Sequence, residues 1–349
     1  MSSIEEYAKK LHCAGEVDRA YAAEDIGYLN APEGVPVLLA RLGGESSLAV
    51  RDAIFQALIR IDADAAIEGS IRLFGSEDPQ IRNQAVDVLR RKGARSIPFL
   101  NTVMREGDKD MRKLVLDVLS EIQTADAREI YLAALADGDV NVVITAVENL
   151  GRSRAGEFRD QIENLLRADS HPMLVGACLE ALVGIGQESS LGAIQRCFPD
   201  LAALPDFLLA SCLKAIAALG SAREFAAVAA LLPVRSLHLR PAILAALLAI
   251  YPRCGPQEPG DSLLPALRSV VENGDPPLCR YRAVRVLGFW AGRDDVCGFL
   301  ISCLSSAERM VRLGAAESLR TAERPGVEPV LATRALEESD EEVLQALSC

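Results

Sequence analysis

The sequence predicts an all-α protein, a solenoid of about ten to eleven antiparallel helix pairs. Three observations predict it. A leucine-type residue recurs about every 31 residues, turn residues separate helical stretches, and no run alternates between apolar and polar residues as a strand would. A period near 31 is too long for a coiled coil and too short for an ordinary domain, so it indicates one supersecondary unit copied many times.

The recurring residues mark the last turns of the second helix in each pair. They are Leu29, Leu58, Leu89, Leu119, Leu150, Leu182, Ile216, Leu247, Leu287, Leu319 and Leu347. Half of the residues are hydrophobic but only 5% are aromatic, so small aliphatic side chains fill the core. Such side chains suit thin layers of closely spaced helices.

The second repeat displays the unit most plainly. We expect its first helix over 65–74 and its second over 79–91, with Asp78 capping the second helix and Pro79 in its first turn. Apolar side chains recur in the second helix at the i, i+4, i+7 and i+8 positions, which form one stripe. Gly93 then ends it.

The later repeats follow the same plan in order. We expect helices over 97–104, 111–122, 127–135 and 142–150, and turns at 170–172, 204–206 and 237–241. The prediction is a single continuous array over 1–349, with terminal capping units at 1–30 and 325–349. The Pro/Gly-rich stretch 252–261 is interpreted as a plain insertion, with a hinge or a contact loop as alternatives.

The charge and the cysteines limit the functional class. A net charge of −12 and a pI of about 4.9 disfavour nucleic acids and anionic membrane surfaces as partners. Nine cysteines without a CxxC pair suit buried thiols in a reducing compartment. The N-terminal residues have no apolar signal core and no apolar stretch is long enough to insert into a membrane, so we expect a cytoplasmic protein.

Four segments of the second helices share a pattern of an aliphatic residue followed by arginine and, eight positions after the first, leucine. They are 50–58, 81–89, 111–119 and 311–319. With the period and the turn aspartates, this pattern resembles HEAT-repeat proteins of the short bacterial type, such as the HEAT-like repeats of phycobilisome lyases. The resemblance implies a right-handed superhelix whose first helices are convex and second helices concave, and it implies a scaffold or adaptor.

An arginine stands seven residues before the recurring leucine in six repeats. The series is Arg51, Arg82, Arg112, Arg240, Arg280 and Arg312. We interpret Arg51, Arg82, Arg112 and Arg312 as structural, with each guanidinium binding carbonyls or acids such as Asp78 and Asp108 in a neighbouring turn. An anion-binding stripe is the alternative, but Val143, Val175 and Leu209 interrupt it.

An acid stands two residues before the recurring leucine in successive repeats. The series is Asp87, Asp117, Glu148 and Glu180, and Glu317 repeats the position later. This position points away from the buried stripe, so a solvated face is one interpretation. The other is a row that binds a basic segment of a partner protein.

A basic cluster is predicted near the C-terminal end. Arg280, Arg282 and Arg285, followed by Trp290, are candidate partner-binding residues.

The three histidines have no metal-ligand spacing. No phosphate-binding loop or nucleophile elbow occurs either, so no cofactor, metal or catalytic residue is expected.

The function predicted is a non-catalytic protein–protein interaction scaffold that binds one or more partner proteins on the second-helix surface. The alternative is a bilin lyase-like enzyme, or a subunit of one, that acts on a protein partner. A HEAT-like DNA glycosylase is disfavoured because it needs a basic surface. The sequence leaves open the partner, the pathway, the oligomeric state and whether the concave surface binds a small ligand.

Overall fold

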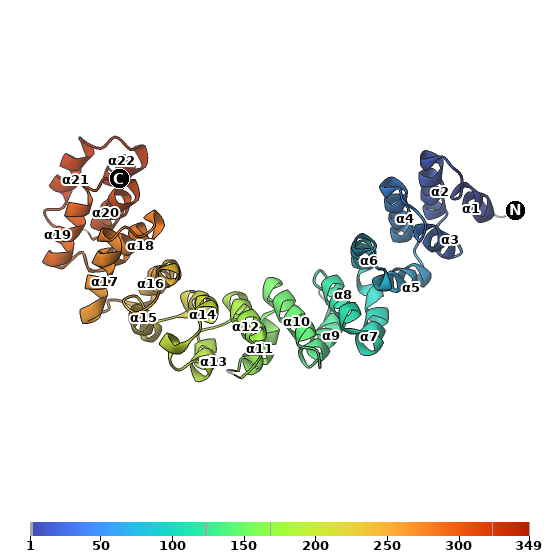
Figure 1. The fold of residues 1–349 in the computed structure, drawn as a ribbon, viewed down its shortest axis with the longest axis horizontal. Coiled ribbons are helices and arrows are strands. Elements are labelled where there is room, and N and C mark those ends of the chain that lie inside the picture. The colour runs from blue at the N-terminus through green and yellow to red at the C-terminus, as the bar shows by residue number, and fades with distance from the viewer. Residues whose placement is uncertain (1–2, 123, 168, 323, 349) are drawn as a thin grey trace. The chain divides into compact units, whose positions relative to one another are not determined.

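Helices form all of the regular structure in the described part of the chain. The computed structural model describes residues 3–122, 124–167, 169–322 and 324–348. It divides into two compact units, Met1–Ser153 and Arg154–Cys349. Eleven helix pairs fall in the described residues, five in unit 1 and six in unit 2 (Figure 1). The all-α fold and the number of pairs are as the sequence predicts.

Unit 1 is built of two layers of helices. Its elements are α1 (Ser3–Lys10), α2 (Glu16–Leu29), α3 (Gly34–Leu42), α4 (Leu48–Arg60), α5 (Asp64–Arg72), α6 (Pro79–Lys92), α7 (Ile97–Glu106), α8 (Lys109–Leu119), α9 (Ala125–Leu135) and α10 (Val140–Arg152). Each even-numbered helix packs against its odd-numbered partner and against the next even-numbered helix, and α3, α5, α7 and α9 form the second layer in the same way.

Unit 2 repeats the pairing. Its elements are α11 (Arg159–Leu165), α12 (Pro172–Ile185), α13 (Ser190–Cys197), α14 (Asp206–Leu219), α15 (Ala222–Ala229), α16 (Arg240–Cys254), α17 (Gly260–Glu272), α18 (Pro277–Leu287), α19 (Asp294–Cys303), α20 (Arg309–Thr321), α21 (Glu328–Ala335) and α22 (Glu341–Ser348). Successive even-numbered helices again pack closely, whereas α13, α15, α17, α19 and α21 make few contacts with one another.

The recurring leucine-type positions lie in the core, with one exception. Leu58, Leu182 and Leu247 have no exposed surface, but Leu29 is 40% exposed. In α2 the buried residue is instead Ile26, three positions earlier. Gly27 lies so close to α4 that a β-carbon there would be 2.8 Å from Ala57 Cα, and this close approach fixes which side of α2 is buried.

Acidic turn residues cap α6, α8 and α10. Asp78 accepts a hydrogen bond from Gln80 N, and Asp139 accepts one from Asn141 N. Asp108 accepts from Asp110 N and Met111 N of α8, both at 2.9 Å. These bonds satisfy amides that have no partner inside the helix, and they set where each helix begins.

Lys and Arg side chains from neighbouring repeats donate hydrogen bonds to carbonyl oxygens at the C-terminal ends of even-numbered helices. Lys92 Nζ donates to the carbonyl oxygens of Ile59 and Ile61 at the end of α4, at 2.7 and 2.5 Å. Arg253 makes three such bonds at the end of α14, and Arg320 donates to Leu347 O at 2.8 Å. Positive side chains also interact favourably with the helix dipole there.

Candidate functional site

A polar groove of about 620 Å³ lies on the even-numbered layer of unit 1. It crosses α6, α8 and α10. Its charged lining consists of Arg82, Asp108, Asp110, Lys113, Asp117, Glu148 and Arg152. Charged side chains of both signs therefore line a hollow of the size that binds ligands in other proteins.

Asp117 and Glu148 are the two predicted acids that face this groove. Neither carboxylate forms a salt bridge with another residue in the described part of unit 1. Glu148 is exposed, whereas Asp117 is half-buried. Burial raises the pKa of Asp117, and the cations Arg90, Arg152 and Lys113 act in the opposite direction. Two carboxylates are thus left without a partner of their own.

The other acids of the predicted row have partners. Asp87 lies 3.3 Å from Arg90 Nη1. In unit 2, Glu180 accepts from Lys214 Nζ at 2.7 Å, and Glu317 accepts from Tyr281 Oη and from Arg285. The row is therefore not uniform, because Lys214 and Arg285 stand at the equivalent positions of neighbouring helices and neutralise the acids there.

The arginine series makes two kinds of contact with the turns between odd- and even-numbered helices. Arg51 Nε donates to Glu45 O in its own turn at 2.7 Å, and Nη1 donates to Asp78 Oδ2 in the next turn at 2.8 Å. Arg112 likewise contacts Gly107 O and Asp137. Arg240, Arg280 and Arg312 each have an acid of the following turn as partner, namely Asp275, Glu308 and Glu338.

Arg82 departs from this pattern. It donates to Ser76 O and Glu77 O in its own turn, at 2.5 and 3.1 Å, but it has no acidic partner in the described residues. Asp108 instead caps α8, and Asp78 binds Arg51 of the preceding repeat. Asp78 therefore pairs with the arginine of the preceding repeat and not with Arg82, which lies four residues later.

Sequence reasoning missed the first arginine of the series. Arg19 in α2 contacts Cys13 O and Ala14 O in its own turn and Glu45 in the next. It stands seven residues before Ile26 rather than before Leu29. Arg19 becomes recognisable once Ile26 is taken as the buried position of α2, because the other arginines of the series also stand seven residues before a buried leucine.

The predicted basic cluster is not assembled. Arg280 donates to Val271 O at 2.8 Å, Arg282 donates to Pro241 O at 2.9 Å, and Arg285 binds Glu317. Each guanidinium thus contacts a different part of unit 2. These contacts occur because successive helical positions point in different directions around α18.

Trp290 is buried, so it is not available as a surface anchor. It is 7% exposed and packs edge-on against Tyr251 and Phe289, which stack with ring centroids 3.7 Å apart. Its Nε1 donates to Gln257 O at 2.6 Å. Trp290 therefore ties down the Pro/Gly-rich segment, whose first residues, 252–254, continue α16 instead of forming a loop.

Two features are absent from the described residues, a metal-binding cluster and a membrane-spanning helix. No cluster of three or more His, Cys, Asp or Glu side chains in that part of the chain is arranged to hold a metal ion. No helix described there is long and apolar enough to cross a membrane. The thiols of Cys178 and Cys212 are fully buried, and burial raises the pKa of each to about 12.

Comparison with known proteins identifies the repeat. A family model for HEAT repeats matches residues 70–151, within unit 1, and residues 264–348, within unit 2. These two stretches of the chain carry HEAT repeats. Among curated proteins, the bilin biosynthesis protein PecE of Mastigocladus laminosus is 35% identical over 71 residues, which cover 20% of this chain and 26% of PecE. The match thus spans about a quarter of that relative.

Solved structures with the same fold are HEAT-type solenoids. A mutant of Kap121p covers 99% of this chain with a TM-score of 0.66 at 13% identity, and Kap121p bound to Nup53p does so with a TM-score of 0.58 at 14% identity. This chain spans 44% of each of them. At such identities the likeness concerns the fold alone, which is the α-solenoid that the HEAT repeats predict.

Proposed function

We propose that this HEAT-repeat chain is a non-catalytic scaffold that binds a partner protein in the polar groove of unit 1. The observation that carries the proposal is that Asp117 and Glu148 line one groove and have no salt-bridge partner in the described residues. Their unpaired carboxylates suit a segment of the partner that carries Lys or Arg. Arg82, which has no acidic partner in the described residues, would orient that segment by donating hydrogen bonds to one of its carbonyl or carboxylate oxygens.

The charge of the chain supports a protein partner over nucleic acid. A net charge of −12 repels phosphates over the whole surface, whereas it speeds the approach of a basic protein. We also propose a cytoplasmic location, no membrane insertion and no cofactor.

Charge reversal tests the groove. Asp117→Lys and Glu148→Lys should each weaken capture of the partner from native extract, and the double variant should also reduce the salt dependence of binding. Glu129→Lys is the matched control, because Glu129 is an exposed acid on the odd-numbered helix α9. Equal capture by the double variant and by the control would rule out the groove as the binding site.

The second candidate is a bilin lyase-like enzyme or enzyme subunit that acts on a protein partner. The local similarity to PecE, whose name assigns it to bilin biosynthesis, is the observation that favours it. Incubation of the full chain with a free bilin and a phycobiliprotein apoprotein tests this function. A bilin absorbance band that comigrates with either protein after denaturing electrophoresis would favour the lyase, and its absence would favour the scaffold.

A further inference from the structure

The arginine series of the even-numbered helices shares one binding arrangement, and Arg82 leaves it incomplete. In the other repeats that carry it, the guanidinium meets an acid of the following turn. The pairs are Arg19 with Glu45, Arg51 with Asp78, Arg112 with Asp137, Arg240 with Asp275, Arg280 with Glu308, and Arg312 with Glu338. Arg82 has no acidic partner in the described residues, so the place that an acid takes in the other repeats is open here.

The acid that corresponds to these partners is Glu106, which lies in a helix and not in a turn. Asp137 stands two residues before the aspartate that caps the next helix, and Glu106 stands at the same distance from its own capping aspartate. However, α9 ends before Asp137, whereas α7 continues through Glu106 and leaves this side chain exposed. An acid that completes the arrangement at Arg82 must therefore come from another molecule.

The open donors of Arg82 can be reached from the polar groove of unit 1. Its Nη1 donates to carbonyl oxygens of its own turn, whereas Nε and Nη2 have no acceptor in the described residues. Neither of these two nitrogens is shut off from solvent, unlike the Nε atoms of Arg112 and Arg240. They are the same two donors with which Arg19 binds Glu45. Since Arg82 lines the groove, a carboxylate there can accept both hydrogen bonds.

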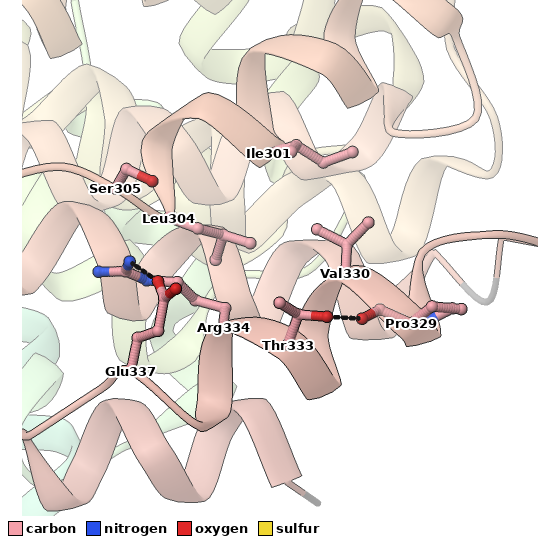
Figure 2. Close-up of a pocket in the computed structure, with 8 residues that line it drawn as sticks. All are labelled: Ile301, Leu304, Ser305, Pro329, Val330, Thr333, Arg334 and Glu337. Carbon is pink, nitrogen blue, oxygen red and sulfur yellow. Dashed lines mark hydrogen bonds and ion pairs between the residues drawn. The ribbon is translucent and has the colours of Figure 1, made fainter.

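Other cations that line grooves already have an acid of their own. In the groove of unit 1, Lys113 lies 2.7 Å from Asp110 of the same helix. Figure 2 shows a groove between α19 and α21 of unit 2, where Arg334 and Glu337 lie 2.9 Å apart. Among these three cations, Arg82 is the one whose charge is left for a ligand.

The rest of the groove restricts what can carry the carboxylate. Four acids line it against three cations, so an anion with no positive group of its own, such as a phosphate, is repelled. Asp117 and Glu148 lack a salt bridge in the described residues and suit a Lys or Arg side chain. The ligand must therefore present an acid and a base together, as a segment of a protein does.

The length of α8 sets the spacing between these two charges. Asp110 lines the groove in the first turn of α8 and Asp117 lines it about two turns later, which places them about 10 Å apart along the helix. Arg82 stands in the first turn of α6 and so belongs to the end where α8 begins. An extended peptide covers this distance in about three residues.

We infer that the groove binds a partner segment in which an Asp or Glu, held by Arg82, lies about three residues from a Lys or Arg, held by Asp117 and Glu148. The inference rests on the proposed function, because it concerns the same groove. It adds that the acid of the partner is recognised as well as the base, and it fixes their separation.

Four capped octapeptides with an uncharged fluorophore test this recognition. Gly-Ser-Glu-Ser-Gly-Lys-Ser-Gly carries both charges, and its versions have Gln in place of Glu, of Lys, or of both. Fluorescence anisotropy with the full chain should give the tightest binding for the peptide with both charges. It should bind about fivefold more tightly than the version without Glu, because it gains a pair of charge-assisted hydrogen bonds.

Two variants assign the contacts, and a third is the matched control. Arg82→Gln should remove the preference for Glu and leave the affinity for the peptide without Glu unchanged. Glu148→Lys should weaken binding of both peptides that contain Lys. Arg91→Gln removes an exposed arginine of the same helix, α6, that lines no part of the groove, and it should bind all four peptides as the wild type does.

Equal binding of the wild type to the peptides with and without Glu would overturn the inference and leave the proposed function standing, because the base alone would then be recognised. Tightest binding of the peptide without Lys would also overturn it, since the acids of the groove would then play no part. No binding of any peptide at millimolar concentration would overturn it as well, while partner capture by Asp117→Lys and Glu148→Lys would still decide the proposed function. These results are read from the wild type, so they do not depend on how well Arg82→Gln folds.

Discussion

Arg19 binds Glu45 through two parallel hydrogen bonds, with Nε–Oε2 and Nη2–Oε1 distances of 2.9 and 3.1 Å. Arg312 binds Glu338 in the same way near the other end of the chain, at 2.8 and 3.0 Å. Both glutamates are almost completely buried. Each pair links an even-numbered helix to the turn of the following repeat, 26 residues later.

Replacing Glu45 with Gln should destabilise unit 1 by about 3 kcal/mol, because it leaves the partly buried guanidinium groups of Arg19 and Arg41 without their shared carboxylate. The measurement is the free energy of unfolding in urea. Glu68→Gln is the control, since Glu68 is 52% exposed and should change stability by less than about 0.5 kcal/mol. A loss no larger than that of the control would contradict the structural role of Glu45.

The same carboxylate predicts how stability depends on pH. The hydrogen bond from Arg19, aided by Ser47 N and Arg41, lowers the pKa of Glu45 to about 2 from an ordinary value of 4.5. A group with a depressed pKa in the fold stabilises it above pH 4.5, and this contribution disappears as the pH falls toward 2. Urea midpoints should therefore fall more steeply over this range in the wild type than in Glu45→Gln.

Asp117→Asn should leave stability at pH 7 unchanged or higher while it weakens partner capture. Burial raises the pKa of Asp117, so its charged form is unfavourable in the folded state. Any stability advantage of the variant should shrink at low pH, where the wild-type carboxyl is protonated. Urea unfolding at pH 7 and pH 4 measures this, with Glu148→Gln as the exposed comparison. A large loss of stability at pH 7 would contradict the expectation.

Trp290→Phe and Trp290→Ala should distinguish the aromatic packing of Trp290 from its hydrogen bond to the Pro/Gly-rich segment. The alanine variant should lose about 3 kcal/mol of stability with the aromatic packing against Tyr251 and Phe289. The phenylalanine variant keeps most packing but lacks the donor to Gln257 O. Limited digestion with a glutamate-specific protease should then cut faster after Glu258. Unchanged cutting would mean that other contacts hold the loop.

The buried thiols should react only when unit 2 unfolds. Cys178 and Cys212 have no exposed surface and a pKa raised to about 12, so little thiolate forms at pH 8. Iodoacetamide should label the partly exposed Cys13 first, as peptide mass spectrometry can show. Labelling of all three at similar rates in native buffer would contradict the burial.

The sequence predicts this fold well because helix periodicity and turn chemistry are local properties. The start of α6 at Pro79, its cap Asp78 and the burial of the recurring leucines follow from spacing alone. The buried position of α2 is Ile26 and not Leu29, since the sequence does not reveal how closely Gly27 approaches α4. Such contacts between helices are not local.

The candidate site was less predictable, because it depends on which charges meet across helices. Spacing placed Asp117 and Glu148 on one surface but could not reveal that Lys214 and Arg285 neutralise the equivalent acids in unit 2. Spacing also could not show whether Trp290 is an exposed anchor or a buried packing residue.

The uneven packing of unit 2 has a mechanical consequence. Its even-numbered helices pack closely in series, while the backbones of α13, α15, α17, α19 and α21 approach one another at few points. A force that separates the odd-numbered helices disturbs few backbone contacts, whereas a force that separates the even-numbered helices must disrupt the core. Unit 2 should therefore have one stiff edge and one compliant edge, so that its curvature can change without unfolding.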